Sequence, residues 1–211
     1  MVSHPSIAPY ASLELSASPP RAGELRARFM GVTTILLDDG EIAILTDGFF
    51  SRPPLGRVII RKLVSDTKRI DAAFHAAQIE HVAAVFVAHA HYDHAMDCAT
   101  VALRTGALLI GSESVANIGR GACVPDDRLR IIRGGEIYAF ERFNVTVYRT
   151  VHSPHARFPG VISEPLSQPA RVRAYQEGGC YSFLVEHDGR RILIHPSANV
   201  VPGMYEGVRA D

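Results

Sequence analysis

The hexapeptide HAHYDH at residues 89–94 is the segment of this chain best suited to chemistry. It places three histidines and one aspartate close together, namely His89, His91, Asp93 and His94. Imidazole and carboxylate groups are the ligands that zinc and similar divalent metals prefer. Because residues two apart on an extended chain point to the same side, we expect His89 and His91 to converge on one ion. Asp93 and His94 follow where the chain turns, and we expect them to face a neighbouring ion.

The segments on either side position this hexapeptide at the end of a buried strand. The apolar run VAAVFVA at residues 82–88 is typical of a strand buried on both faces. Residues 95–104 are predicted to form a helix. Folds that alternate strands and helices bind their ligands at the carboxyl ends of such strands. The alternative is a solvated histidine-rich loop, in which three close imidazoles would repel one another once protonated.

The hexapeptide resembles the HxHxDH signature of the metallo-β-lactamase fold superfamily of metal-dependent hydrolases. Residues 28–53 look like the N-terminal β-hairpin of that fold, and their TDGFFSRP segment is loosely similar to the lactonase-like branch. His152, after a predicted strand at residues 145–151, occupies the place of the third histidine ligand. The resemblance covers about residues 25–200 and implies an α/β (α+β) protein, an αββα sandwich of the metallo-β-lactamase type.

The resemblance also implies a set of metal ligands. His89, His91 and His152 would hold one ion, and Asp93 and His94 would serve a second. Three protein ligands with one open position are typical of catalytic zinc, which activates a water molecule for attack. With a single ion, Asp93 could instead act as the general base or orient the water.

Asp47 resembles the aspartate that holds a ligand histidine by its other ring nitrogen; the alternative is a simple turn residue. His195 stands where the family usually has a carboxylate that bridges two metals. A neutral imidazole has one lone pair, so a bridged pair of ions is less well supported. His195 could join Asp93 and His94 in a set suited to zinc, manganese or iron, or it could be a pocket histidine without a metal.

No histidine follows His195, whereas the family continues with another αβ segment and a last ligand. We therefore expect the last αβ segment of the sandwich to be missing, either because the protein is naturally short or because it is cut off. An edge left open in this way favours pairing with a second copy, as a homo-oligomer.

Length and composition are ordinary for a globular domain. We expect an N-terminal tail or arm at residues 1–24 and one metallo-β-lactamase-like domain at residues 25–211. The 22 basic and 22 acidic residues balance, so the composition predicts neither a nucleic-acid nor a membrane partner. The three cysteines form no Cys-x-x-Cys pair. A reducing, cytoplasmic location is the simpler expectation.

Other patterns predict the remaining elements. Residues 28–37 and 42–45 are expected to be the strands of the first hairpin, with a loop at residues 48–56. A helix capped at Ser65 or Asp66, another from Ser112 to Ile118, further strands and a hairpin at residues 181–194 follow. The proline-bearing segment 153–178 is predicted to be a pocket wall or lid, and otherwise a mobile insertion. His155 is expected to be exposed, with a pocket residue that acts as an acid or contacts the substrate as the alternative. His187 is expected to lie on the surface.

The predicted function is a metal-dependent hydrolase, with one or two Zn²⁺ ions, or Mn²⁺ or Fe²⁺ in their place. A metal-activated water would attack an ester, lactone or related bond of a small-molecule substrate. Two alternatives stay open. One is a degenerate member that binds metal without turnover, and the other is an iron-dependent oxidoreductase of the same fold. Metal content separates the three.

Overall fold

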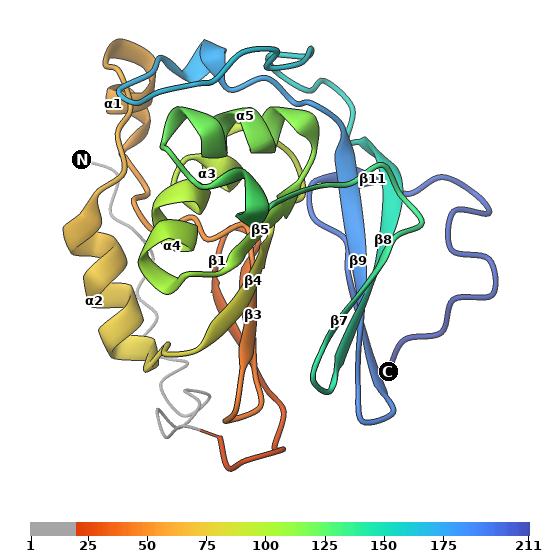
Figure 1. Cartoon of the computed structure of the whole chain (residues 1–211). Helices are drawn as coiled ribbons and strands as arrows, with labels where there is room; N and C mark the ends of the chain where they lie inside the picture. The colour runs from red at the N-terminus through yellow and green to blue at the C-terminus, as the bar shows by residue number, and fades with distance from the viewer. Residues whose placement is uncertain (1–19) are drawn as a thin grey trace, which may run out of the picture.

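The computed structural model of this protein describes residues 20–211. Their strands form two sheets that lie face to face, and the helices cover the outer face of one of them (Figure 1). Of the predicted tail at residues 1–24, all but the last five residues lie outside the described part. Within residues 20–211, no helix has the length and apolar character that a membrane span requires.

The first sheet has six strands in chain order: β1 (Arg26–Gly31), β2 (Thr34–Asp38), β3 (Ala43–Thr46), β4 (Val82–Phe86), β5 (Leu108–Gly111) and β6 (Leu129–Ile131). Strands β1 to β3 are antiparallel, and β3 to β6 are parallel to their neighbours. Parallel neighbours need crossover connections, which the helices supply. The carboxyl ends of β3 and β4 therefore meet at one edge, where Asp47 and the hexapeptide follow.

The second sheet is antiparallel and has five strands: β7 (Ile137–Phe140), β8 (Phe143–His152), β9 (Cys180–His187), β10 (Arg190–Ile194) and β11 (Ala198–Asn199). Its longest ladder joins β8 to β9, from Phe143 opposite His187 to Thr150 opposite Cys180. On the other side of β8, β7 pairs with its first residues and β11 with its last two. His152, at the end of β8, is thus held at the edge that carries the hexapeptide.

The helices are α1 (Leu55–Ile60), α2 (Thr67–Ala77), α3 (Tyr92–Ala95), α4 (Cys98–Thr105) and α5 (Glu113–Gly121), with short 3-10 turns η2 (Asp126–Arg128) and η3 (Val172–Ala174). The Asp66 side chain accepts a hydrogen bond from the backbone N–H of Arg69 and caps α2. Ser112 caps α5 in the same way through Val115. The cap at Asp66 is as predicted, and the cap at Ser112 was not predicted; each satisfies a backbone N–H that the first turn leaves free.

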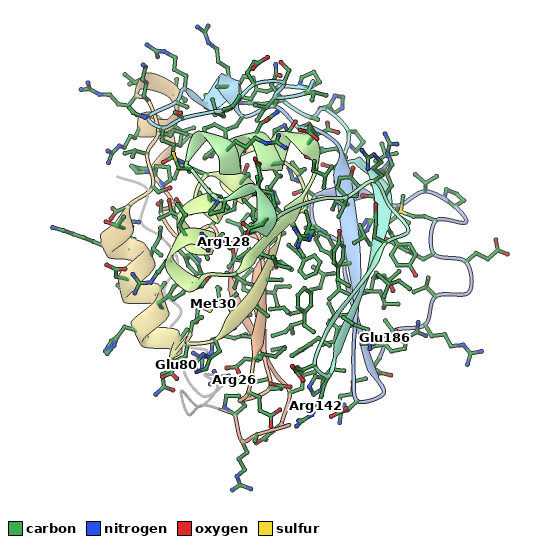
Figure 2. All side chains as sticks on the ribbon, viewed as in Figure 1. Arg26, Met30, Glu80, Arg128, Arg142 and Glu186 are labelled. Atoms are coloured by element: carbon green, nitrogen blue, oxygen red, sulfur yellow. The ribbon has the colours of Figure 1, made fainter. Side chains whose placement is uncertain are left out.

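Two apolar clusters hold the layers together. One packs α2, α4 and α5 against the first sheet, and it includes Leu45, Phe74 and Val101. The other fills the space between the sheets, where Figure 2 shows many side chains. The ring centroids of Phe86 and Phe183 lie 5.4 Å apart in this cluster. Residues 200–211 form turns beside the second sheet instead of a helix. The predicted αββα sandwich without its last αβ segment is therefore confirmed, since the described residues form three of the four layers.

Three local predictions were wrong. Residues 28–37 form two strands rather than one, because Gly31 (φ 101°) and Val32 (φ 56°) adopt left-handed conformations that reverse the chain. The helix predicted at residues 95–104 is divided into α3 and α4, with the buried side chain of Asp97 at the break. The loop predicted at residues 48–56 ends early, and α1 begins at Leu55 directly after two prolines, which favour a helix start.

Candidate metal centre

Three histidines from two sheets meet at the carboxyl edge of the first sheet. His89 and His91 follow β4, and His152 ends β8. Their ligand nitrogens all lie within 4.8 Å of one another. Among residues 20–211 this is the one group of histidine, cysteine or acidic side chains arranged closely enough to share an ion. The structure thus brings together the three residues assigned to the first ion from sequence.

The nitrogens of this cluster are available as metal ligands. His89 and His91 are buried, at 1% and 9% exposed. Neither Nδ1 of His89 nor Nε2 of His91 has a hydrogen-bond partner among the described residues. Burial, and then the neighbouring imidazoles, lowers the pKa of both rings, so they are neutral and carry free lone pairs. Unpaired buried nitrogens are costly, and a metal ion would satisfy them.

Backbone groups contact two of the three rings of the cluster. Nδ1 of His152 donates to the carbonyl oxygen of Ser153 at 2.9 Å, which leaves Nε2 for an ion. The His91 ring makes a hydrogen bond to the backbone of Phe158. Such contacts fix the ring orientation and the tautomer of a metal ligand. The donor set and its supporting contacts therefore fit a divalent metal.

Asp47 is fully buried behind the cluster and contacts His94, which is 1% exposed. One carboxylate oxygen lies 2.7 Å from Nδ1 of His94, and the other accepts the backbone N–H of Ala88 at 2.9 Å. Burial would lower the pKa of His94, but the charge and hydrogen bond of Asp47 outweigh it and raise the pKa. Asp47 therefore contacts a histidine at its ring nitrogen, as predicted, and it also fixes the backbone just before His89. That this histidine is a metal ligand stays a prediction.

Two hydroxyl groups around His94 could not be found from the sequence. Thr33, in the turn between β1 and β2, contacts both the Asp47 carboxylate and Nδ1 of His94. The Ser197 hydroxyl lies 3.1 Å from Nε2 of His94. Both residues are far from the hexapeptide in sequence and stand in no motif. Only the fold reveals them, and together with Asp47 they occupy both nitrogens of His94.

A cavity of about 570 Å³ opens onto the histidine cluster. Asp93 is half-buried and lines it, together with His94. The wall is largely apolar and aromatic, and it is formed by α1, α3, η3 and the segment after His152: Leu55, Val58, Ile59, Tyr92, Pro154, Ala156, Phe158, Val172 and Tyr175. Mostly apolar walls with a few polar groups are typical of small-molecule sites.

His195 lies apart from the cluster. Its Nδ1 is 3.0 Å from the Ser182 hydroxyl and also contacts the Tyr205 hydroxyl. It does not line the cavity with the other histidines. Among residues 20–211, Asp93, His94 and His195 therefore form no second group of ligands, and their role with a second ion stays a prediction.

The segment at residues 153–178 is confirmed as a wall of this cavity. It is anchored on α5, where the Asn117 side chain donates to the carbonyl of Ile162 at 2.8 Å and Ser114 accepts the N–H of the same residue at 2.9 Å. Gln168 donates to the carbonyl of Met96 at 2.6 Å. These contacts hold an irregular chain in one position.

Two other histidines were assigned from sequence. His155 is exposed, as predicted, and lines the cavity. The prediction for His187 was wrong, because it is 3% exposed and its Nε2 lies 3.1 Å from the Asp39 carboxylate. Its position beside a turn suggested the surface, but β9 carries it inward against the ring of Phe143.

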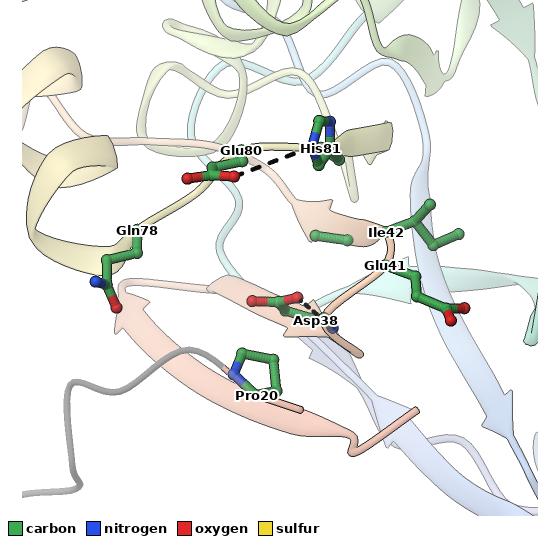
Figure 3. Close-up of a pocket in the computed structure, with 9 residues that line it drawn as sticks. Pro20, Asp38, Glu41, Ile42, Gln78, Glu80 and His81 are labelled. Atoms are coloured by element: carbon green, nitrogen blue, oxygen red, sulfur yellow. Dashed lines mark hydrogen bonds and ion pairs between the residues drawn. The ribbon is translucent and has the colours of Figure 1, made fainter. Parts of the chain in front are cut away.

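Another hollow lies at the opposite end of the first sheet (Figure 3). It has a volume of about 180 Å³, and its wall includes Asp38, Glu41, Glu80 and His81. Glu80 and His81 are 4.0 Å apart and largely exposed. These groups do not converge as a ligand set, so the histidine cluster remains the candidate site.

No protein-family model matches this chain, and no curated protein matches it in sequence. Solved structures do match. Igni18, a metallo hydrolase from the archaeon Ignicoccus hospitalis, aligns with 86% of this chain at 14% identity and a TM-score of 0.52. A Cronobacter sakazakii metallo-β-lactamase with a HARLDQ motif aligns with 89% at 18% identity and 0.52. The metallo-β-lactamase SMB-1 aligns with 85% at 17% identity and 0.50.

These similarities establish that the chain has the metallo-β-lactamase fold, and the resemblance stated from sequence is confirmed at that level. The alignments span 64%, 66% and 65% of the three solved chains, so this chain covers less than two thirds of the length of each.

Proposed function

From this fold and its histidine cluster, we propose that the protein is a metal-dependent hydrolase that acts on an ester, lactone or related bond of a small molecule. One observation carries the proposal. The ligand nitrogens of His89, His91 and His152 lie within 4.8 Å of one another. Two buried nitrogens of this cluster have no partner within residues 20–211. A structural histidine cluster would instead be expected to satisfy its nitrogens.

Zinc is the proposed metal, because three imidazoles with an open fourth position are typical of catalytic zinc. When held by His89, His91 and His152, such an ion would polarise the bond under attack and would lower the pKa of a coordinated water molecule. Asp93 lines the same cavity, and its carboxylate is the proposed acceptor of the proton that the water gives up.

We propose that each chain binds one ion. The three-histidine set is complete, whereas Asp93, His94 and His195 are not gathered. His94 already contacts Asp47 and Ser197, so its proposed role is to pack against His89, whose ring centroid lies 3.9 Å away.

The test is the metal content of the protein purified without chelator, together with hydrolysis of a panel of esters, lactones and thioesters. We expect about one equivalent of zinc and turnover of at least one class. His91→Ala should lose both zinc and activity, since it removes one of three ligands. Its metal affinity should fall by more than the ~10–100-fold expected for the loss of a contact to a ligand. His155→Ala is the matched control, because His155 lines the cavity outside the cluster and should leave metal content unchanged.

Other outcomes would contradict the proposal. Bound iron with no hydrolysis would favour oxidation chemistry, and an empty site in both proteins would favour a member without turnover. Full metal content in His91→Ala would show that the cluster is not the site.

A further inference from the structure

The short helix α1 exposes an unusual amount of apolar surface at the cavity. Leu55 and Ile59 are 68% and 66% exposed, and both line the cavity that opens onto the histidines. Residues four apart lie on the same face of a helix. Val58, at 4% exposed, anchors the helix to the core. Exposed apolar side chains at a site rim usually mark a surface that is covered when a ligand binds.

The rest of the wall extends this apolar surface. Tyr92, Phe158, Val172 and Tyr175 line the same cavity. Along the face formed by Leu55, Ile59 and Val172, a sugar or other polyhydroxyl ligand would leave hydroxyl groups without partners, and burying an unpaired hydroxyl is costly. A hydrocarbon chain is the ligand chemistry that this wall fits.

Positive charge is concentrated in the two segments that contain α1 and the chain after His152. Residues 49–65 and 153–176 carry seven of the 22 basic residues and one of the 22 acidic residues: Arg52, Arg57, Arg61, Lys62, Arg157, Arg171 and Arg173 against Glu164. All seven basic residues are exposed. None forms an ion pair with a carboxylate within residues 20–211. Because the whole chain has no net charge, these two segments are more positive than the rest of the surface, and they would attract anions. Arg157 lines the cavity, whereas Arg57, Arg61 and Lys62 line a separate hollow beside α1.

Arg157 connects the charge to the site, because it is the basic residue of this set that lines the cavity. We propose that the site binds an anionic amphiphile, whose hydrocarbon chain lies along Leu55 and Ile59 and whose negatively charged group meets Arg157. The proposal rests on the proposed function for the bond that is cleaved, and it names the substrate class: a fatty acyl ester or thioester with an anionic group.

The first test measures binding without turnover. Octyl sulfate, methyl sulfate and octyl glucoside are titrated into the metal-loaded protein by calorimetry, below the concentrations at which they form micelles. Methyl sulfate lacks the chain, and octyl glucoside lacks the charge. We expect octyl sulfate to bind at least about tenfold more tightly than either, since both chain burial and charge contribute.

The second test assigns the two contributions to residues. Ile59→Ser should weaken octyl sulfate binding about tenfold, because it removes apolar contact. Arg157→Gln should reduce the preference for octyl sulfate over octyl glucoside about fivefold. Ile60→Ser is the matched control: Ile60 is on the same helix and 69% exposed, but it does not line the cavity. It should change binding by less than about twofold.

Equal losses in Ile59→Ser and Ile60→Ser would overturn the proposal, since they would mean that detergent adheres to any exposed apolar residue. So would an unchanged charge preference in Arg157→Gln. Flotation with vesicles of phosphatidylglycerol and phosphatidylcholine is the third arm. Strong flotation lost equally in both serine variants would assign α1 to a membrane surface instead of a substrate chain. If octyl sulfate binds as expected but no ester is hydrolysed, the proposed function fails and the binding site stands.

Discussion

Two buried histidine–aspartate pairs lie at opposite ends of the sandwich. Asp47 and His94 are 2.7 Å apart at the end that carries the histidine cluster. Asp39 and His187 are 3.1 Å apart at the other end, where β9 finishes. All four side chains are at most 3% exposed. The same pair of side chains, equally buried, therefore occurs in two different surroundings.

The two pairs differ in the residues that surround them. Around Asp39, the backbone N–H groups of Glu41 and Ile42 donate to the carboxylate, and the His187 ring packs on Phe143. Among the described residues, no other histidine, cysteine or acidic cluster that could hold an ion lies there. Around His94, the ring of His89 is 3.9 Å away and the cavity opens beside it. A buried histidine–aspartate pair alone therefore does not indicate a metal site. Unpaired ligand nitrogens and a cavity beside the pair do indicate one.

Asp39→Ala is expected to have the largest effect, a loss of stability. This change leaves His187 and two backbone N–H groups buried without their partner, which should lower the free energy of unfolding by about 3 kcal/mol. Urea unfolding measures it, and metal affinity should stay unchanged. Asp127→Asn, at an exposed position without an ion pair among the described residues, is the control, with an expected change within about 0.5 kcal/mol. Loss of metal in Asp39→Ala would mean that the two ends are coupled.

The next effect in size is on metal affinity, from Asp47→Asn. The carboxylate holds the His94 ring beside His89 and accepts the N–H of Ala88, directly before the first ligand. Removing its charge should weaken zinc binding about 10–100-fold, the usual value of such an outer contact. Competition with a chelator measures the affinity, with Asp39→Ala as the paired comparison. Equal zinc affinity in wild type and Asp47→Asn would remove the distinction between the pairs.

The sequence predicted the parts of the site that local pattern determines. The hexapeptide sits after a continuous apolar strand, so the positions of His89 and His91 followed from local order alone. His152 and Asp47 came from resemblance, because contacts between separate strands leave no local signal. Thr33, Ser197 and the apolar rim of α1 were missed for the same reason.

For His187, the local pattern predicted the wrong environment. A histidine next to an Asp-Gly turn is typical of the surface. In the fold, its strand carries it between the sheets, where Asp39 from another hairpin pairs with it. Only tertiary structure reveals that partner, so no sequence window could distinguish a surface histidine from this buried one.

The smallest expected effect is on the pH dependence of the unfolding free energy. Burial would raise the pKa of Asp39, but the hydrogen bonds from Ile42, His187 and Glu41 outweigh it and lower the pKa. A carboxylate with a lowered pKa stabilises the folded state above its unfolded value of about 3.9, and this contribution is lost as the pH falls through the folded value. The difference in unfolding free energy between wild type and Asp39→Ala should therefore shrink when the pH is lowered from about 5 to about 3.

This difference is measured by urea unfolding with chelator present in both proteins, so that protonation of the histidine cluster does not enter through lost metal. A constant difference across this range would mean that the Asp39 charge adds nothing to stability and that the pair acts through packing and backbone hydrogen bonds. The two aspartates would then differ in the role of their charge as well as in their surroundings. The Asp47→Asn variant tests the charge of Asp47 directly, because asparagine has nearly the same shape as aspartate.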